Sequence, residues 1–550
     1  MQRGTAAITG SRTIPLALAA LVGIAAIIRL RLFAARRSLW FDEAAVAMNI
    51  VDRSFSGLLR PLDHEQSAAP LFLWAERLAL LVGGNNEWAL RALPLIAGLM
   101  LPFAMWSVAR RLLAPIEALV AVALVALSPF LIYYANEVKP YGIDALVTTL
   151  LILAALRIQE RPEAGARWTA LALGGMVAIG ISIPAPLVLA GVALFLLARP
   201  EVRRAPSFAR HVGVTAGAWA VAAALALIVY LPLMRHDSFI GSFMQHYWGT
   251  SFLTTEPPGL KSRALDAASA AIRTTFFDGV MWPQQINMLM LIAIAGAVRI
   301  VMARGAAYAA LFGTPILLLI IAAALKMYPL GDRLILFAAP ITALMLAAGV
   351  TWPAQAVRGR WHTPAAILVG GLMLAVPARG ALKILRQPPG RNETREMIQA
   401  VEASRAAPGP VPRVWLSAGS VMAWQYYTGR THKPAVEPTP GAPLPQADSL
   451  EAGVLVGKWP QSAEGKSKGD WGMWEIQRLR TVDGECAWML LSVLEGGERE
   501  LLMDAIRRSN SRLAETRTAT GAELLNVCVA QPAPPARPAP VDTNGPMPRR

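Results

Sequence analysis

The chain lacks the sequence signatures of nucleotide-driven and metal-dependent chemistry. Its 550 residues contain no Walker loop, no His-Glu-x-x-His pair, no glycine fingerprint for dinucleotides and no cluster of cysteine and histidine. These absences argue against an energy-coupled pump and against an enzyme that uses nucleotide sugars. We therefore expect no cofactor and no dedicated metal site, while the need for a divalent metal stays open.

Charged residues are scarce too, at 16% of the chain, whereas hydrophobic residues make up 55% and the mean hydropathy is +0.43. Soluble domains rarely combine such values with repeated apolar runs long enough to cross a bilayer. The arginine clusters behind the net charge of +16 lie mostly in short segments between these runs. None is interleaved with aromatic residues as in nucleic-acid-binding patches. The composition predicts a polytopic α-helical membrane protein that does not bind nucleic acid.

The apolar runs predict about 11 transmembrane helices, since roughly 20 apolar residues span a bilayer. They lie near residues 14–34, 91–108, 114–134, 141–157, 168–183, 186–198, 212–234, 286–303, 306–325, 334–352 and 364–378. The first run is longer than the apolar part of a cleavable signal peptide, so we expect it to be retained. Basic residues mark the cytoplasmic side, and their positions place the N-terminus in the cytoplasm. Arg36 and Arg37 fall on the outer side against this rule and could serve a site there.

An odd number of spans puts the C-terminus outside, in the periplasm if this is a bacterial inner-membrane protein. The sequence then divides into a transmembrane domain (1–378), a periplasmic α/β domain (379–530) and a Pro-rich, disordered tail (531–550). Two long outer loops are expected in the first domain, at 35–90 and 235–285. The loop at 35–90 should hold surface helices at 43–59 and 70–82, which could lie on the membrane and wall a cavity.

Strand-like and helical runs alternate in the predicted outer domain, which favours a partly parallel sheet. Strands are expected at 413–416, 454–456, 488–494 and 524–529, and helices at 395–405 and 498–508, the first with Asn392 as a possible N-cap. The only cysteines of the chain lie in this domain, Cys486 just before the predicted strand at 488–494 and Cys528 on the predicted strand at 524–529. They could pair in an oxidising compartment or remain two buried thiols.

Polar side chains gather at the predicted outer ends of the spans. They are Asp42 and Glu43 after the first span; His64 and Gln66 in the first outer loop; Arg91 at the start of the second span; Glu137, Lys139 and Tyr141 between the third and fourth; and Tyr328 and Arg333 before the tenth. If the spans form a bundle, these groups converge at one outer mouth. Carboxylates and cations beside lipid suit a substrate with an anionic head and a long apolar tail.

These segments resemble GT-C class glycosyltransferases, specifically the bacterial family 39-like group of protein mannosyltransferases and lipid A aminoarabinose transferases. The resemblance rests on the acidic pair Asp42–Glu43, on Pro-Leu-Phe at 70–72, on Glu-Trp-Ala-Leu-Arg at 87–91, on Glu-Val-Lys-Pro-Tyr at 137–141 and on the Tyr-Pro…Arg element at 328–333. It covers the membrane region and, loosely, the outer domain. It implies transfer of a sugar from a polyprenyl-phosphate donor to a periplasmic lipid, glycan or protein acceptor, with inversion.

The same resemblance implies roles for individual residues. Asp42 would be the general base, with Glu43 as second choice or orienting partner. Lys139 and Arg333 would bind the donor phosphate. The other site candidates are Glu137, Tyr141, Tyr328, His64, Gln66 and Arg91.

Each of these residues could instead have a purely structural role. The acidic pair could cap a helix, the two cations could snorkel or pair at the surface, Glu137 could simply pair with Lys139, Arg91 could start a span, and His64 could be an ordinary loop residue. Ser-Ala-Ala at 67–69 departs from the aminoarabinose transferases, which have a lysine there, so neither lipid A nor that sugar is implied. A lipid-linked glycan polymerase or ligase, a transporter or flippase, and a non-catalytic scaffold remain alternative functions.

Overall fold

The computed structural model describes residues 13–528, apart from 65, 236–247, 255–265, 267, 270, 271, 274, 278–282, 354–360, 430–448, 452, 458–467, 480–485, 495 and 496. The chain forms two compact units. One comprises Met1–Arg37 and Ala45–Pro389, and the other comprises Ser38–Ala44 and Gly390–Arg550. We call them the membrane unit and the sheet unit. The predicted loop at 235–285 lies largely outside the described residues, and the tail at 531–550 lies wholly outside them.

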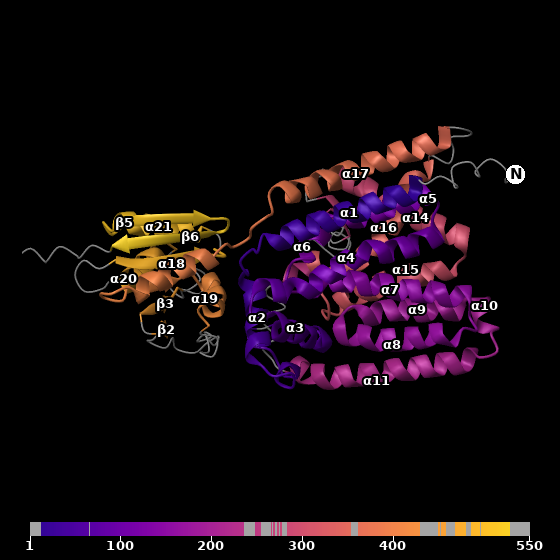
Figure 1. The fold of residues 1–550 in the computed structure, drawn as a ribbon, viewed down its shortest axis with the longest axis horizontal. Coiled ribbons are helices and arrows are strands. Elements are labelled where there is room, and N and C mark those ends of the chain that lie inside the picture. The colour runs from indigo at the N-terminus through magenta and orange to yellow at the C-terminus, as the bar shows by residue number, and fades with distance from the viewer. Residues whose placement is uncertain are drawn as a thin grey trace, which may run out of the picture. The chain divides into compact units, whose positions relative to one another are not determined.

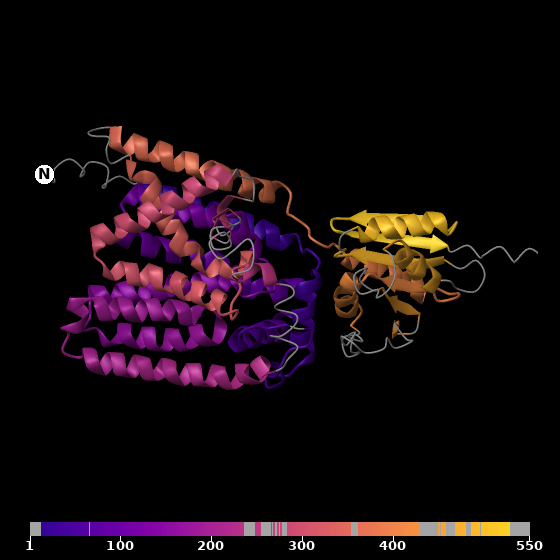
Figure 2. The same ribbon diagram turned by 180° about the vertical axis from the view of Figure 1, so that it is seen from behind.

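The membrane unit is helical throughout its described part, and its long helices run side by side (Figure 1 and Figure 2). Its main helices are α1 (Thr13–Ala34), α2 (Phe41–Asp52, whose first residues belong to the sheet unit), α3 (Pro70–Gly83), α4 (Glu87–Leu112), α5 (Pro115–Leu127), α6 (Pro129–Tyr134), α7 (Tyr141–Glu160), α8 (Gly165–Ile181), α9 (Ala185–Ala198), α10 (Pro200–Arg203), α11 (Phe208–Arg235), α14 (Pro283–Arg304), α15 (Ala307–Ala324), α16 (Ala339–Thr351) and α17 (His362–Arg386). Short 3₁₀ turns are η1 (Gly57–Leu59), η3 (Gly249–Ser251) and η4 (Asp332–Ala338).

Among the described residues, 8 helices are long and apolar enough to cross a membrane: α1, α4, α7, α11, α14, α15, α16 with part of η4, and α17. The shorter apolar helices α5, α8 and α9 fall in the remaining predicted runs. Every run identified in the sequence therefore coincides with an apolar helix. The prediction of a polytopic helical membrane protein is confirmed.

The predicted span at 114–134 is not one continuous helix. It breaks between α5 and α6 at Ser128, because Pro129 cannot donate to the preceding turn and starts a helix well. The Ser128 hydroxyl caps α6 by accepting the N–H of Leu131 at 3.1 Å. The carbonyl groups that end α5 are satisfied by Arg29 of α1, whose guanidinium donates to the oxygens of Val125 (3.2 Å) and Ala126 (2.9 Å). Arg29 itself is completely buried.

Of the two helices in the first outer loop, one is shorter than predicted and the other matches the prediction. Helix α2 ends at Asp52, short of the predicted 43–59, and η1 follows separately. Helix α3 matches the predicted 70–82 closely, with Pro70 at its first position. The carboxyl group of Glu76, on α3, is fully buried, and neither oxygen has a hydrogen-bond partner in the described part of the chain. Burial raises the pKa of Glu76 well above its usual value.

The sheet unit is a mixed six-stranded sheet between two layers of helices. Its strand order is β2-β3-β1-β4-β6-β5, with β1 (Val414–Leu416) parallel to both β3 (Val454–Val456) and β4 (Cys486–Ser492). The pairs β2 (Ser449–Glu451) with β3, β4 with β6 (Ala522–Cys528), and β5 (Arg512–Ala519) with β6 are antiparallel. The predicted α/β class, with a partly parallel sheet, is confirmed.

Each face of this sheet is covered by its own pair of helices. Val414 and Leu416 of β1 pack with α18 (Arg395–Ala406) and α19 (Val421–Thr428). The intervening Trp415 packs on the other face with α20 (Lys468–Arg478) and α21 (Glu498–Arg508). Alternate residues of a strand point to opposite faces, so a strand buried on both faces is apolar throughout.

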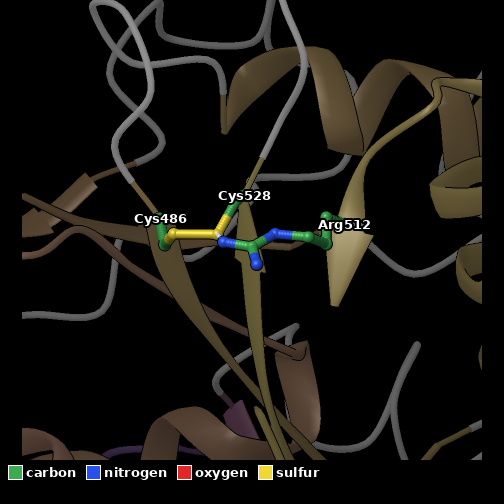
Figure 3. The surroundings of a disulfide bond; sticks show 3 residues. All are labelled: Cys486, Arg512 and Cys528. Carbon is green, nitrogen blue, oxygen red and sulfur yellow. Dashed lines mark hydrogen bonds between the residues drawn. A yellow bond between two sulfur atoms is a disulfide. The ribbon is translucent and has the colours of Figure 1, made fainter. Parts of the chain in front are cut away.

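A disulfide joins the ends of two neighbouring strands of this unit. Cys486 and Cys528 are direct partners in the β4–β6 pairing, and their sulfur atoms are bonded (Figure 3). The Arg512 guanidinium of β5 lies 3.9 Å from the Cys528 sulfur. The bond links positions 42 residues apart in sequence. In this structure the two cysteines therefore form a disulfide rather than two buried thiols.

Candidate functional site

The candidate polar residues of the membrane unit lie at one end of its helices. At the other end, the Tyr308 hydroxyl near the start of α15 donates to Gln159 near the end of α7, at 2.8 Å. Arg333, which follows α15, lies against Tyr141 at the start of α7, so the two helices run in opposite directions. The start of α7 and the end of α15 lie together at the far end. Lys139 precedes α7 and Tyr328 follows α15, so these two candidates share that end.

Lys139 is a buried cation in the tight turn between α6 and α7. Its ammonium group donates to the Gln66 side-chain oxygen at 2.8 Å, and the two side chains are 5% and 8% exposed. Gln66 in turn donates to the backbone oxygen of His64 at 3.1 Å. His64 adopts a positive φ of 59°, which only a few non-glycine residues do. The contact brings together segments 73 residues apart, as expected of a site rather than of a cation reaching for bulk water.

Arg333 lies between two aromatic rings. Its guanidinium carbon is 5.7 Å from the ring centre of Tyr141 and 5.5 Å from that of Trp248. The Trp248 ring packs against Gly331, where an added Cβ would lie 2.2 Å from it. Aromatic faces attract cations, so the rings hold the guanidinium at the same end of the unit as Lys139.

The turn that carries Glu137 and Lys139 is held by Arg37, a residue that sequence alone assigned only to the outer side of the membrane. The Arg37 guanidinium donates to the backbone oxygen of Asn136 at 2.7 Å and lies 4.6 Å from the ring centre of Tyr133. Glu137 is completely buried. Arg91 donates to the backbone oxygen of Arg37 at 2.7 Å, which suits a structural role for Arg91 better than a phosphate contact.

Tyr328 and Asp144 form a further polar group near the start of α7. The Tyr328 hydroxyl donates to the backbone oxygen of Leu334 at 2.8 Å. Burial, followed by the charges of Asp144 and Tyr141, raises the pKa of Tyr328 well above its usual value. Asp144 is 4% exposed and sits in the first turn of α7. Asp144 was not among the candidates expected from the sequence, although a carboxylate inside an apolar run is itself a signal of function.

Asp42 and Glu43 belong to the sheet unit and differ in their surroundings. Both lie in the first turn of α2. The Glu43 carboxylate is 2% exposed and accepts the backbone N–H of Trp40 at 3.4 Å, which is how an acidic side chain caps a helix start. The Asp42 side chain is only partly buried. Glu43 is buried in a capping role, and the greater exposure of Asp42 makes it the better candidate for proton transfer.

Within the described ranges, no group of three or more His, Cys, Asp or Glu side chains is placed to hold a metal ion. The candidate residues instead offer a buried ammonium, an aromatic-walled guanidinium and carboxylates. The two cations of the membrane unit can bind an anionic headgroup, and the Asp42 carboxylate of the sheet unit can accept a proton.

A family model matches part of the chain. Residues 67–235 match the dolichyl-phosphate-mannose-protein mannosyltransferase family, and this stretch contains Arg91, Glu137, Lys139 and Tyr141. The match confirms the resemblance to GT-C glycosyltransferases. Together with the apolar helices, the match supports a multi-pass membrane protein. No curated protein sequence matches the chain.

The chain is similar to several solved structures at low sequence identity. ArnT from Cupriavidus metallidurans bound to undecaprenyl phosphate shares 12% identity, covering 93% of this chain and 97% of that one, with a TM-score of 0.49. The Archaeoglobus fulgidus oligosaccharyltransferase in complex with Zn and sulfate shares 13%, covering 74% of this chain and 61% of that one, with a TM-score of 0.48. The chain thus spans less than two thirds of that enzyme.

Proposed function

We propose that this protein transfers a sugar from a polyprenyl-phosphate donor to an acceptor at the periplasmic face of a bacterial inner membrane, with inversion at the anomeric carbon. The observation that carries the proposal is the buried Lys139–Gln66 pair at 2.8 Å. It stands at the end of a bundle of apolar helices, and Lys139 lies within the segment that matches a family of lipid-linked sugar transferases. A charge buried beside lipid is costly unless it has a partner or a task.

In the proposed reaction, the acceptor hydroxyl oxygen attacks the anomeric carbon and the bond from that carbon to the phosphate oxygen breaks. The electron pair leaves with the polyprenyl phosphate, and the hydroxyl proton passes to the Asp42 carboxylate. A positioned base of this kind contributes about 10²–10⁴-fold. Lys139 and Arg333 stabilise the negative charge that grows on the leaving phosphate.

The other candidates shape the site in this proposal. Glu137 orients Lys139 within its turn, while Gln66 fixes the ammonium group. Tyr141 holds the Arg333 guanidinium, and Tyr328 and His64 line the donor side. Arg91 binds the backbone of Arg37, which holds the turn before α7, and does not contact the substrate.

The test uses the full chain in nanodiscs, supplied with a panel of polyprenyl-phosphate-linked sugars and a crude envelope extract. Donor consumption and new product are followed by mass spectrometry for wild type, Asp42→Asn and Glu43→Gln. We expect Asp42→Asn to lose about 10²–10⁴-fold in turnover, with Glu43→Gln far less affected. Wild-type turnover by Asp42→Asn would remove Asp42 as the base. Donor movement across the bilayer without any product would favour a transporter instead.

A further inference from the structure

The peptide that carries the acidic pair is bound by the start of the C-terminal region. Residues Ser38–Ala44 form part of the sheet unit together with Gly390–Arg550. The segment that contains Asp42 is therefore grouped with residues about 350 positions away rather than with the chain on either side of it, as in the Ser38–Glu393 contact of separation 355. The contacts behind this grouping involve Ser38, Leu39 and Trp40.

Ser38 and the start of α18 satisfy each other's backbone groups. The Ser38 N–H donates to the Glu393 carboxylate at 2.9 Å, and the Ser38 hydroxyl accepts the N–H of Arg395 at 3.2 Å. Thr394, the N-cap residue of α18, makes no side-chain cap of its own. The first N–H groups of a helix need outside acceptors, and Ser38 supplies one from a distant part of the chain. The expected N-cap, Asn392, instead donates to the backbone oxygen of Gly521.

The next two residues are held by different parts of the unit. The Leu39 N–H donates to the Tyr427 hydroxyl on α19 at 2.7 Å. The Arg391 guanidinium lies 3.3 Å from the ring centre of Trp40. Ser38, Leu39 and Trp40 are 6%, 0% and 5% exposed. Backbone and side-chain contacts thus fix the peptide up to the residue before α2 begins.

The residues that hold this peptide are themselves tied to the sheet. The Glu393 N–H donates to the backbone oxygen of Thr520 at 3.0 Å, in the turn between β5 and β6. Gly521, in the same turn, has a φ of 67°, and an added Cβ would lie 1.7 Å from the backbone oxygen of Arg391. Only glycine fits both requirements. The contacts to residues 38–40 therefore rest on the sheet rather than on a free linker.

We propose that Arg391, Glu393, the Arg395 N–H and Tyr427 form a clamp whose task is to position Asp42 for proton transfer. These are positioning residues, because they act through the peptide at 38–40. The inference rests on the proposed function, since it takes Asp42 as the base. It makes the C-terminal domain part of the catalytic apparatus, so that loosening the clamp slows the proton-transfer step without weakening donor binding.

The test compares full-length variants in nanodiscs. Tyr427→Phe removes the acceptor for Leu39 and keeps the ring. Glu393→Ala removes the acceptor for Ser38, while Glu393→Gln retains an oxygen in its place. Glu523→Gln is the matched control, because it breaks a surface ion pair with Arg499 in the same unit, at 2.7 Å. Steady-state kinetics for donor and hydrogen exchange at the amides of Ser38 and Leu39 are measured for each.

We expect Tyr427→Phe and Glu393→Ala to lower kcat by about fivefold to tenfold, as the loss of one hydrogen bond does, with the donor KM within about twofold. Hydrogen exchange should accelerate at the Leu39 amide in Tyr427→Phe and at the Ser38 amide in Glu393→Ala. Glu393→Gln should recover most of the wild-type kcat. The control Glu523→Gln should match wild type in both measurements. Faster exchange with unchanged kcat would overturn the clamp, and so would unchanged exchange. If Asp42→Asn is inactive in that case, the proposed function still stands. If Asp42→Asn turns over normally, Asp42 is not the base and the clamp loses its premise, whereas the absence of any transfer by wild type would defeat the proposed function.

Discussion

Replacing Lys139 by methionine should separate a structural role of this lysine from a role in donor binding. The ammonium group donates to Gln66 at 2.8 Å in a buried setting. Without it, the Gln66 oxygen loses this partner, which costs about 1–3 kcal/mol of folding free energy. If the same ammonium group binds the donor phosphate, its loss removes a charged hydrogen bond worth about 1.5–3 kcal/mol. That corresponds to a roughly 10- to 150-fold fall in kcat/KM for the donor.

A double variant distinguishes the two losses. Gln66→Leu combined with Lys139→Met replaces both partners by apolar groups, a change that is often nearly neutral for stability. Thermal unfolding of the double variant should therefore recover toward that of wild type. Donor kinetics should stay impaired, because the cation is still absent. Lys139→Arg, which keeps the charge, is the matched control for the single variant.

The assay is donor consumption by mass spectrometry across a range of donor concentrations, with thermal unfolding measured on the same nanodisc samples. A Lys139→Met protein that unfolds earlier yet keeps wild-type donor kinetics would show that Lys139 only supports the turn before α7. Recovery of donor use in the double variant would lead to the same conclusion. Either result would refute the assignment of Lys139 to the donor phosphate.

Two further predictions concern stability. Because burial raises the pKa of Glu76 above its unfolded value, the folded protein holds this proton more tightly than the unfolded chain does, and its free energy of unfolding should fall as pH rises above about 4.5. Unfolding of wild type and Glu76→Gln is compared between pH 5 and 8. Parallel plots of unfolding free energy against pH for the two proteins would contradict the prediction. Non-reducing peptide mapping should recover Cys486 linked to Cys528, and Cys528→Ser should cost the sheet unit about 3–4 kcal/mol for a link across 42 residues; alkylation of both thiols without reductant would contradict the pairing.

Apolar runs predicted where the membrane helices lie, because each span must be apolar along its whole length whatever it packs against. The runs could not reveal the break at Ser128, since α5 and α6 are both apolar and the partner that satisfies the end of α5 comes from α1. In the sheet unit, β1 and β4 were found as apolar runs because both faces of each are covered. Strand β5 was missed because every one of its residues is exposed, which leaves no alternating pattern.

The candidate residues could be found from their positions at span ends, but their partners could not. The contact of Lys139 with Gln66 and the ring pair around Arg333 depend on how helices are brought together. The cap formed by Glu43 is local and was among the alternatives considered from sequence. The contacts of residues 38–40 with Glu393 and Tyr427 join parts of the chain that no local pattern relates.

Arg29 sets an order of events during biosynthesis. Its acceptors on Val125 and Ala126 lie 96 and 97 residues further along the chain. Chains are synthesised at about 5–20 residues per second. Roughly 5–20 s therefore pass between synthesis of Arg29 and synthesis of the carbonyl groups that offset the cost of placing its charge in the bilayer. Until then this charge must be shielded by lipid headgroups, water or the insertion machinery. We therefore expect maturation of the membrane unit to include a late step, in which the arrival of α5 allows the Arg29 side chain to become buried.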